Sequence, residues 1–284
     1  MTILSRQSRT RASWQSLLAI ALVIYPLTAG TTESPSLEFE LRNHNPFLQV
    51  FGLPPFQSAI LTPEDEFALR VNVDLANNSD AGDTPAESAV IDGETYLMTM
   101  SFRRRVAPWL ELGVDLPFIA HTGGFMDNAI ESWHDIFGIS NTRRRNPRNQ
   151  LNFLYERDGN TVYNLGSSTT GIGDVQLTGA VPVRRSADGG ADISLRASLK
   201  LPTGNEARLH GSGAIDFAAA IYACDTRTIF NSDLRLGAFL GVLVLGNGEV
   251  LPEIQRNAVP FGGASVTWQA TDRLALSTQL HVQG

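Results

Sequence analysis

Apolar and polar side chains alternate with a period of two along most of the chain after residue 66. In the sharpest case, Leu110, Leu112, Val114, Leu116 and Phe118 alternate with Glu111, Gly113, Asp115 and Pro117. Because successive side chains of a β-strand point to opposite faces, each such segment predicts a strand with one apolar and one polar face. We therefore expect an all-β, antiparallel protein.

The alternation predicts nine strands, at residues 66–77, 90–104, 109–120, 171–183, 191–202, 213–223, 229–244, 258–269 and 273–283. A soluble antiparallel sandwich and a transmembrane β-barrel both produce such a pattern. The predicted strands run about ten residues, the length that crosses hydrocarbon at a tilt, whereas soluble strands average about 5–6 residues. The connections also alternate between short turns and long loops (77–89, 120–170, 203–212 and 245–257), as in outer-membrane barrels.

These features favour an antiparallel transmembrane β-barrel over the sandwich. The polar faces carry charges that suit a lumen: Arg70, Asp74, Glu111, Asp115, Arg196, Lys200, Asp216 and Arg235. Bacterial single-chain barrels close with an even number of strands, so nine indicates either a missing C-terminal portion or a miscount of one hairpin. With the missing strands we expect roughly ten to twelve.

The first thirty residues are typical of a secretory signal peptide. Arg6, Arg9 and Arg11 precede a short apolar run at residues 17–25, and small residues follow Pro26. The alternative is a retained anchor, although the run is shorter than the ~20 residues of a spanning helix. We expect a signal peptide at 1–30, a periplasmic leader or plug at 31–65 and a barrel domain at 66–284, in the outer membrane of a Gram-negative bacterium.

The region before the first predicted strand lacks alternation. Residues 43–55 contain Pro46, Pro54 and Pro55, which argues against an interior strand because proline lacks the ladder donor. The region is also rich in Phe and Leu for a solvated linker. It is expected either to enter the mouth or lumen of the barrel as a plug or to pack on the barrel rim.

The longest loop contains an amphipathic helical pattern. Apolar residues at helical spacing form one stripe, which includes Phe125, Ile130, Trp133 and Phe137. Such a helix could fold inward as a constriction, lie on the outer leaflet or cap the barrel. Arg143, Arg144, Arg145 and Arg148 follow it and would suit either contact with anionic lipopolysaccharide or a solvated loop.

Several motifs occur in a characteristic order: NHNPFLQVFGLP at 43–54, DGETY at 92–96, GGF at 123–125, ESWHDIFG at 131–138, and LKLPTG at 199–204 with GSG at 211–213. Together they resemble an uncharacterised bacterial family of exported outer-membrane barrel-like proteins, filed as a domain of unknown function. The resemblance covers residues 43–284, and it implies a location, a fold and strands beyond residue 284. It supplies no substrate or catalytic residue, and LKLPTG also recurs in other outer-membrane barrels.

Composition and motifs narrow the function classes. Lys and Arg number 22 against 29 Asp and Glu, which disfavours nucleic acid as a partner because phosphates require a basic face. The single cysteine, Cys224, precludes a disulfide within the chain and a multi-cysteine zinc site. His121, His134 and His210 fall in predicted loops without metal-ligand spacing, and no G-x-S-x-G nucleophile elbow is present. We expect no enzyme, no catalytic residue, no metal and no cofactor.

Two function classes remain at this point. The first is a narrow or gated passage for small solutes, and the second is a structural or interaction barrel of the cell envelope. A soluble periplasmic β-sandwich that binds a ligand is the alternative if the barrel is wrong. The expected partners are outer-membrane lipid, lipopolysaccharide and a small solute, and the oligomeric state is not specified by the sequence.

Overall fold

The computed structural model describes residues 40–139, 149–186, 190–229, 232–271 and 274–284. The expected signal peptide, residues 31–39 of the leader and the four arginines at 143–148 lie outside these ranges. Within them the chain is all-β apart from one α-helix, α1 (Met126–Ile136), and a short 3-10 helix, η1 (Glu206–Arg208). The strands form one antiparallel sheet of twelve.

The main part of the sheet is a meander of neighbouring antiparallel strands, in the order β1-β2-β3-β7-β8-β9-β10-β11-β12. Their bounds are β1 (Phe67–Asp83), β2 (Glu87–Ala107), β3 (Leu110–Thr122), β7 (Gln176–Arg184), β8 (Asp192–Lys200), β9 (Asp216–Ile229), β10 (Ser232–Val244), β11 (Ala258–Thr271) and β12 (Leu274–Gln283). A short strand, β6 (Thr169–Ile172), precedes β7 and also pairs with β3. Each of the nine expected spans therefore corresponds to one strand of the meander.

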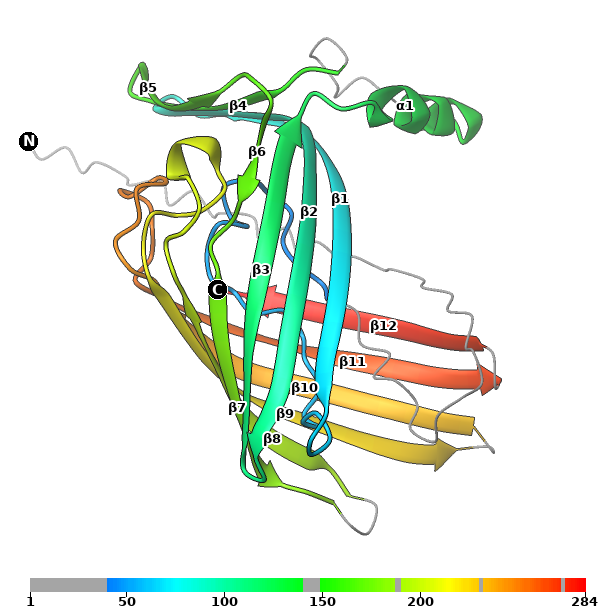
Figure 1. Cartoon of the computed structure of the whole chain (residues 1–284). Coiled ribbons are helices and arrows are strands. Elements are labelled where there is room, and N and C mark those ends of the chain that lie inside the picture. The colour runs from blue at the N-terminus through cyan, green and yellow to red at the C-terminus, as the bar shows by residue number, and fades with distance from the viewer. Residues whose placement is uncertain (1–39, 140–148, 187–189, 230–231, 272–273) are drawn as a thin grey trace, which may run out of the picture.

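The sheet curves strongly, so that β1–β3 lie opposite β9–β12 across a common interior (Figure 1). We call the side that faces this interior the inner face and the opposite side the outer face. Within the described residues β1 and β12 form the two ends of the meander and do not pair with each other, so the sheet is not closed. The expected barrel is thus observed only as an open, curved antiparallel sheet.

Two expectations about the connections are wrong. The long loop expected at 77–89 is a continuation of the hairpin, because β1 runs to Asp83 and β2 begins at Glu87. The short connection between the strands expected at 213–223 and 229–244 is part of β9, and Cys224 is buried on the inner face. In both places the residues near the turn continue the ladder of main-chain hydrogen bonds, which requires no apolar pattern.

The loop expected at 120–170 contains a hairpin besides the expected helix. Strands β4 (Asn152–Arg157) and β5 (Asn160–Leu165) pair with each other, and β4 extends the sheet beside the first residues of β2. We call this four-stranded extension of β1, β2, β4 and β5 the flap. It lies across the end of the molecule that carries the longer connections, which we call the long-loop rim (Figure 1).

Residues 40–66, the N-terminal segment, run along the inner face between β1–β3 and β9–β12 (Figure 1). This placement rests on contacts from both sides. Thr62 N–H donates to Glu111 of β3, Gly52 N–H donates to Asp216 of β9, and Phe56 packs against aromatic rings of β9 and β10. The segment therefore fills the space that the curved sheet encloses.

Candidate functional site

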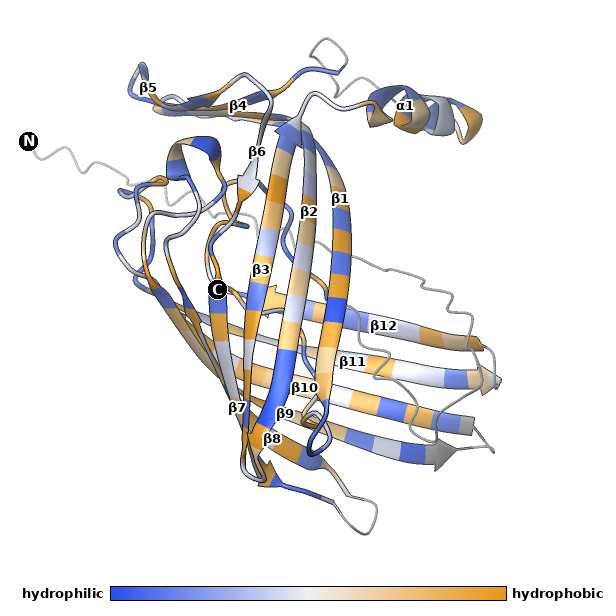
Figure 2. Ribbon diagram, viewed as in Figure 1, coloured by the Kyte–Doolittle hydropathy of each residue, from blue (hydrophilic) through white to orange (hydrophobic). Residues whose placement is uncertain are grey.

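The sheet exposes apolar side chains on its outer face and buries polar ones on its inner face, the reverse of the usual arrangement in a water-soluble protein. On the outer face, large apolar side chains are exposed on strand after strand: Leu69, Val71, Val73, Leu75, Leu112, Leu177, Leu195, Phe217, Ile221, Leu240, Val242, Val266, Leu280 and Val282. Leu240 is 67% exposed and Val73 is 59% exposed. Figure 2 shows the alternation along these strands. An apolar surface that extends over so many strands marks a contact with lipid or with another protein.

The inner face buries polar and charged side chains. Ser194 and Lys200 of β8 are 0% and 2% exposed, and Asp216 of β9 is 1% exposed. Glu111 and Asp115 of β3 are buried as well. Since buried charges are costly unless they are paired, the pairing of these groups determines what the interior can do.

Lys200 is the centre of a buried charge cluster, which we call the Lys200 cluster. Its Nζ lies 2.7 Å from Asp174 Oδ2 and 3.0 Å from Asp216 Oδ2. The ammonium group also donates to the Val50 carbonyl oxygen at 3.1 Å and to Ser212 Oγ. Four oxygen atoms from different parts of the chain thus converge on one side chain.

The two carboxylates of this cluster are held by main-chain N–H groups. Gly204 and Ser212 donate to Asp174, at 2.8 and 3.0 Å. Gly52 and Gly246 donate to Asp216, at 2.9 and 3.1 Å. Gly52 belongs to the N-terminal segment, and a Cβ at this position would lie 3.0 Å from the Asp216 Cβ, so the segment contacts the wall directly. The Lys200 cluster therefore connects the N-terminal segment to β8, β9 and three loops.

A second charged pair contacts the N-terminal segment at residues 58–62, nearer to β1. Arg196 of β8 pairs with Glu111 of β3 at 2.9 Å, and Arg196 Nε donates to the Ser58 carbonyl oxygen at 2.9 Å. Glu111 in turn accepts a hydrogen bond of 2.6 Å from Thr62 N–H. This pair, which we call the Arg196–Glu111 latch, holds residues 58–62 against opposite parts of the wall.

The other expected lumen charges also lie on the inner face. Asp115 pairs with Arg103 of β2 at 2.7 Å, a partner that the sequence analysis did not single out. Arg70 and Asp74 of β1 face Glu40 and His44 of the N-terminal segment. Arg235 shares its side of β10 with Gly237, whose ideal Cβ position lies 2.5 Å from the Phe56 ring. The structure thus brings Lys200 together with Asp216, and Arg196 with Glu111, but it places Asp115, Arg70, Asp74 and Arg235 elsewhere on the wall.

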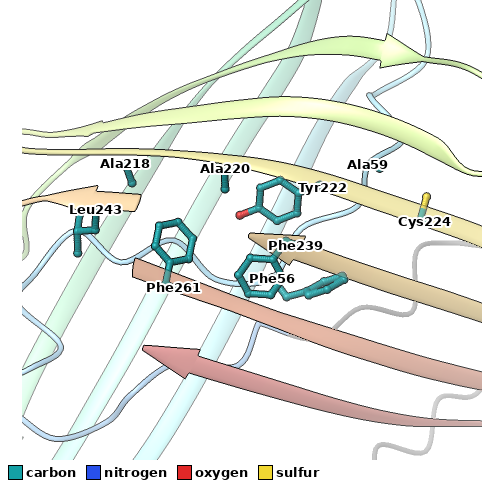
Figure 3. Close-up of a cluster of buried hydrophobic side chains, with 9 residues drawn as sticks. All are labelled: Phe56, Ala59, Ala218, Ala220, Tyr222, Cys224, Phe239, Leu243 and Phe261. Atoms are coloured by element: carbon teal, nitrogen blue, oxygen red, sulfur yellow. The ribbon is translucent and has the colours of Figure 1, made fainter. Parts of the chain in front are cut away.

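Aromatic side chains fill the half of the interior next to β9, β10 and β11. Phe56 of the N-terminal segment packs edge-on against Phe239, with ring centroids 5.2 Å apart, and Tyr222 stacks on Phe239 at 5.2 Å. Figure 3 shows these rings pointing toward one another. Small side chains make room for them, and the whole cluster comprises Phe56, Ala59, Ala218, Ala220, Tyr222, Cys224, Phe239, Leu243 and Phe261.

A second apolar cluster lies beneath the flap at the long-loop rim. It joins the N-terminal segment to the flap and to two loops, through Phe47, Val50, Leu151, Phe153, Tyr155, Leu165, Leu209 and Val250. Tyr163 of β5 donates a hydrogen bond of 2.9 Å to the Ala207 carbonyl oxygen, and burial raises the pKa of Tyr163 to about 12. Burial also lowers the pKa of His210, which bonds Thr169 at 2.9 Å. These contacts close the long-loop rim over the N-terminal segment.

The expected constriction helix is present as α1, with the expected amphipathic stripe. Phe125, Trp133 and Phe137 are exposed, Ile130 is half-buried, and the helix projects sideways from the end of β3 (Figure 1). A role as a constriction stays a prediction.

Three large aromatic side chains are exposed at the end of the sheet that carries the short turns. Phe67, Trp109 and Trp268 are all strongly exposed, and they lie at or near the ends of β1, β3 and β11 where the short turns are. Exposed aromatic side chains thus occur at the short-turn end of the sheet on three of its strands or turns. Aromatic residues near the ends of predicted strands were the signal in the sequence for this end of the sheet.

The serine and histidine side chains at the long-loop rim, Ser212, His121 and His210, are all buried. Ser212 touches Lys200, but it is 0% exposed beneath the N-terminal segment, so a substrate would not reach it in this conformation. The His121 and His210 rings stack with centroids 5.9 Å apart, and they bond to Thr95 and Thr169. In the same ranges, no group of three or more His, Cys, Asp or Glu side chains is placed to hold a metal ion.

The comparisons with known proteins give a family but no activity. Among the described residues there is no helix with the length and hydropathy to span a bilayer. No curated protein and no solved structure matches the chain. A family model described as "Protein of unknown function (DUF3187)" matches residues 16–284. The chain therefore belongs to this family of unknown function.

Proposed function

We propose that the chain forms the wall of an outer-membrane β-barrel whose interior is closed by its own N-terminal segment, and that small solutes pass only when this segment moves. The observation that carries the proposal is the reversal of the two faces: the apolar outer face is exposed and the polar inner face is buried. In a soluble sandwich the apolar faces pack against each other. Here the layer that packs on the sheet is the N-terminal segment, and it lies on the polar face.

The outer face has the pattern expected for lipid. A barrel in a bilayer presents an apolar band bounded by aromatic residues, and strands satisfy their main-chain hydrogen bonds only if the sheet closes. We infer that the edges of β1 and β12, which do not pair with each other in the described ranges, are closed in the membrane, in a barrel of roughly ten to twelve strands. The expected signal peptide supports export to the outer membrane, where barrels of this kind occur.

The inner face supports a closed state rather than an open pore. The N-terminal segment is held by the Lys200 cluster, by the Arg196–Glu111 latch and by the Phe56 ring. A cavity between this segment and β8 and β9, lined by Gln57, Arg196 and Tyr222, has a volume of about 10 Å³, enough for roughly one water molecule. This small cavity and the contacts above support a passage that opens only when the segment leaves part of the wall.

The interior also supports a second function, a structural or interaction barrel that never opens. The two apolar clusters bind the N-terminal segment independently of the charges, and the flap covers the long-loop rim. In that case loosening the charged contacts would destabilise the protein without producing a pore.

The first experiment tests membrane insertion. Full-length protein is expressed with its first thirty residues, and washed outer membranes are run unboiled and boiled on a denaturing gel. We expect faster migration of the unboiled band, because a closed barrel resists the detergent. A soluble periplasmic protein without this shift would overturn the barrel and restore the ligand-binding sandwich.

The second experiment tests the gate. Arg196→Gln removes the charged half of the latch, and Leu195→Ala, on the outer face of the same strand, is the matched control. In planar bilayers we expect the wild type and the control to stay closed, and Arg196→Gln to show channel openings. If Arg196→Gln retains the gel shift but conducts no more than the control, the closed structural barrel is the correct function.

A further inference from the structure

Four large apolar side chains in α1 and next to its ends are exposed. Phe125, Trp133, Ile136 and Phe137 are between 55% and 77% exposed, and the Trp133 and Phe137 rings lie 4.5 Å apart. At 3.6 residues per turn Trp133, Ile136 and Phe137 share one side of the helix, and Phe125 directly precedes its first turn. Exposing an apolar stripe of this size to water is unfavourable. Such a stripe is therefore expected to contact a partner.

The N-terminal end of α1 is attached firmly to the sheet. Glu94 Oε1 of β2 accepts hydrogen bonds from the main-chain N–H groups of Phe125 and Met126, at 2.8 and 2.5 Å. Asp127 accepts from the Asn77 side chain at 3.0 Å. Gly124 fits beside Glu94 with φ of 69°, where a Cβ would overlap the carboxylate. The direction of the helix is therefore set by the wall of the sheet.

That direction takes α1 away from the interior. Figure 1 shows the helix at the long-loop end of β1–β3, extending sideways past β1 and across the direction of these strands. The exposed apolar residues of β1, which include Val73 and Leu75, lead up the outer face toward the same end. Exposed apolar residues of α1 and of the outer face therefore occur at the same end of the molecule.

We propose that α1 lies in the outer leaflet of the membrane, parallel to its surface, with Phe125, Trp133, Ile136 and Phe137 at the boundary between lipid headgroups and acyl chains. This inference rests on the proposed membrane barrel. Aromatic and aliphatic residues on one side of a helix with a polar opposite side are typical of interfacial helices. As an interfacial helix, α1 fixes the position of the long-loop rim relative to the membrane surface.

The side of α1 opposite the exposed apolar residues carries acidic side chains, which bear on the headgroup charge that the helix prefers. Asp127, Glu131 and Asp135 lie there, and Asp127 is buried against Asn77. Carboxylates do not attract an anionic headgroup. Burial of apolar area, and not attraction to anionic headgroups, therefore holds α1 on the surface. We expect binding to zwitterionic phosphatidylcholine that changes little with salt, in contrast to a basic interfacial helix.

The experiment measures the depth of Trp133 in the full-length protein. The protein is reconstituted in phosphatidylcholine vesicles with bromine near the headgroup or deep in the acyl chains, and tryptophan emission is recorded. The emission of Trp133 is obtained as the difference between wild type and Trp133→Phe. Trp268→Phe gives the same difference for a residue of the outer face.

We expect the Trp133 emission to be quenched more by shallow than by deep bromine. Quenching of Trp268 without quenching of Trp133 would overturn the interfacial helix and leave the barrel intact. Absence of quenching for both tryptophans would overturn the barrel itself. If Trp133 is protected from bromine and α1 instead cross-links to α1 of a second copy, the partner is protein and the inference is wrong.

A double variant tests the apolar side directly. Ile136→Glu combined with Phe137→Glu places charge in the proposed contact, and Asn128→Glu is the matched control on the polar side. Both sites are exposed, so the gel shift should remain in each variant. We expect the double variant to lose most of the shallow quenching of Trp133 and the control to retain it. Equal quenching in the two variants would contradict the proposed contact.

Discussion

The outer and inner faces of the same strands differ in what covers them. On β10, Leu240 is 67% exposed on the outer face, whereas its neighbour Phe239 is 6% exposed among other rings on the inner face. On β8, Leu195 is exposed and Lys200 is buried. The comparison shows that alternation by itself specifies two faces but not their surroundings. The face whose polar groups form hydrogen bonds and ion pairs with the N-terminal segment and the loops is the one that becomes the inner face.

The largest expected effect concerns the inner face. Lys200→Met would leave Asp174 and Asp216 buried beside each other without their cation, a loss that typically costs about 3–5 kcal/mol. The unfolding free energy in detergent, from urea titration, measures it. Combining the change with Asp216→Asn removes one charge and should recover part of the loss. An unchanged midpoint for Lys200→Met would mean that the N-terminal segment is not held by this cluster.

The outer face gives the next effect. Leu240→Arg places a charge at an exposed apolar position and should cost about 2–4 kcal/mol at the middle of a bilayer. In water the same surface change would fall within about 0.5 kcal/mol. Folding into phosphatidylcholine vesicles, compared with Leu240→Ala, distinguishes the two environments. A negligible cost for arginine would remove the main difference between the faces.

The flap provides a smaller effect. Tyr163→Phe removes the hydrogen bond to the Ala207 carbonyl oxygen but keeps the ring that packs edge-on against Phe47. Loss of one such bond costs about 1 kcal/mol. Hydrogen exchange of the β4 and β5 amides should become faster while exchange in β9 and β10 does not change. Uniform acceleration in all strands would show that the flap and the wall open as one unit.

The smallest expected effect is a pH dependence at the long-loop rim. The pKa of His210 is lowered by burial and by the nearby Arg208, so the unfolded chain binds a proton at this residue before the folded chain does. Stability is therefore present above about pH 6.5, the ordinary histidine value, and falls as the pH drops below it. Unfolding midpoints at about pH 8 and about pH 5 should differ less in His210→Gln than in wild type. An equal difference would assign the effect to other groups.

The positions of the meander strands could be predicted because each has its own alternating segment. The boundaries of β1 and β2 could not, since residues 78–83 are small or polar on both sides and are held by pairing alone. The β4–β5 hairpin was missed for a related reason. Its strands are only six residues each, and their apolar residues pack on the N-terminal segment rather than on a repeated face.

The inner charges were predicted as a set, but their pairing was not. Lys200 contacts Asp174, 26 residues away, and both belong to loops or strands whose relative register the sequence does not specify. Asp174 and Arg103 were therefore missed, although both are essential partners in the pairs that the structure contains. The local pattern predicts a polar face, and only the curvature of the sheet decides which charges meet.

The position of the N-terminal segment has a consequence for the order of assembly. Gly52 and Asp216 are 164 residues apart, and Arg196 and Ser58 are 138 apart, so these contacts close very long loops. A chain cannot easily thread into a cylinder that has already been sealed. If the sheet closes as proposed, the N-terminal segment must be in position before the last strands are added, and the wall then forms around it.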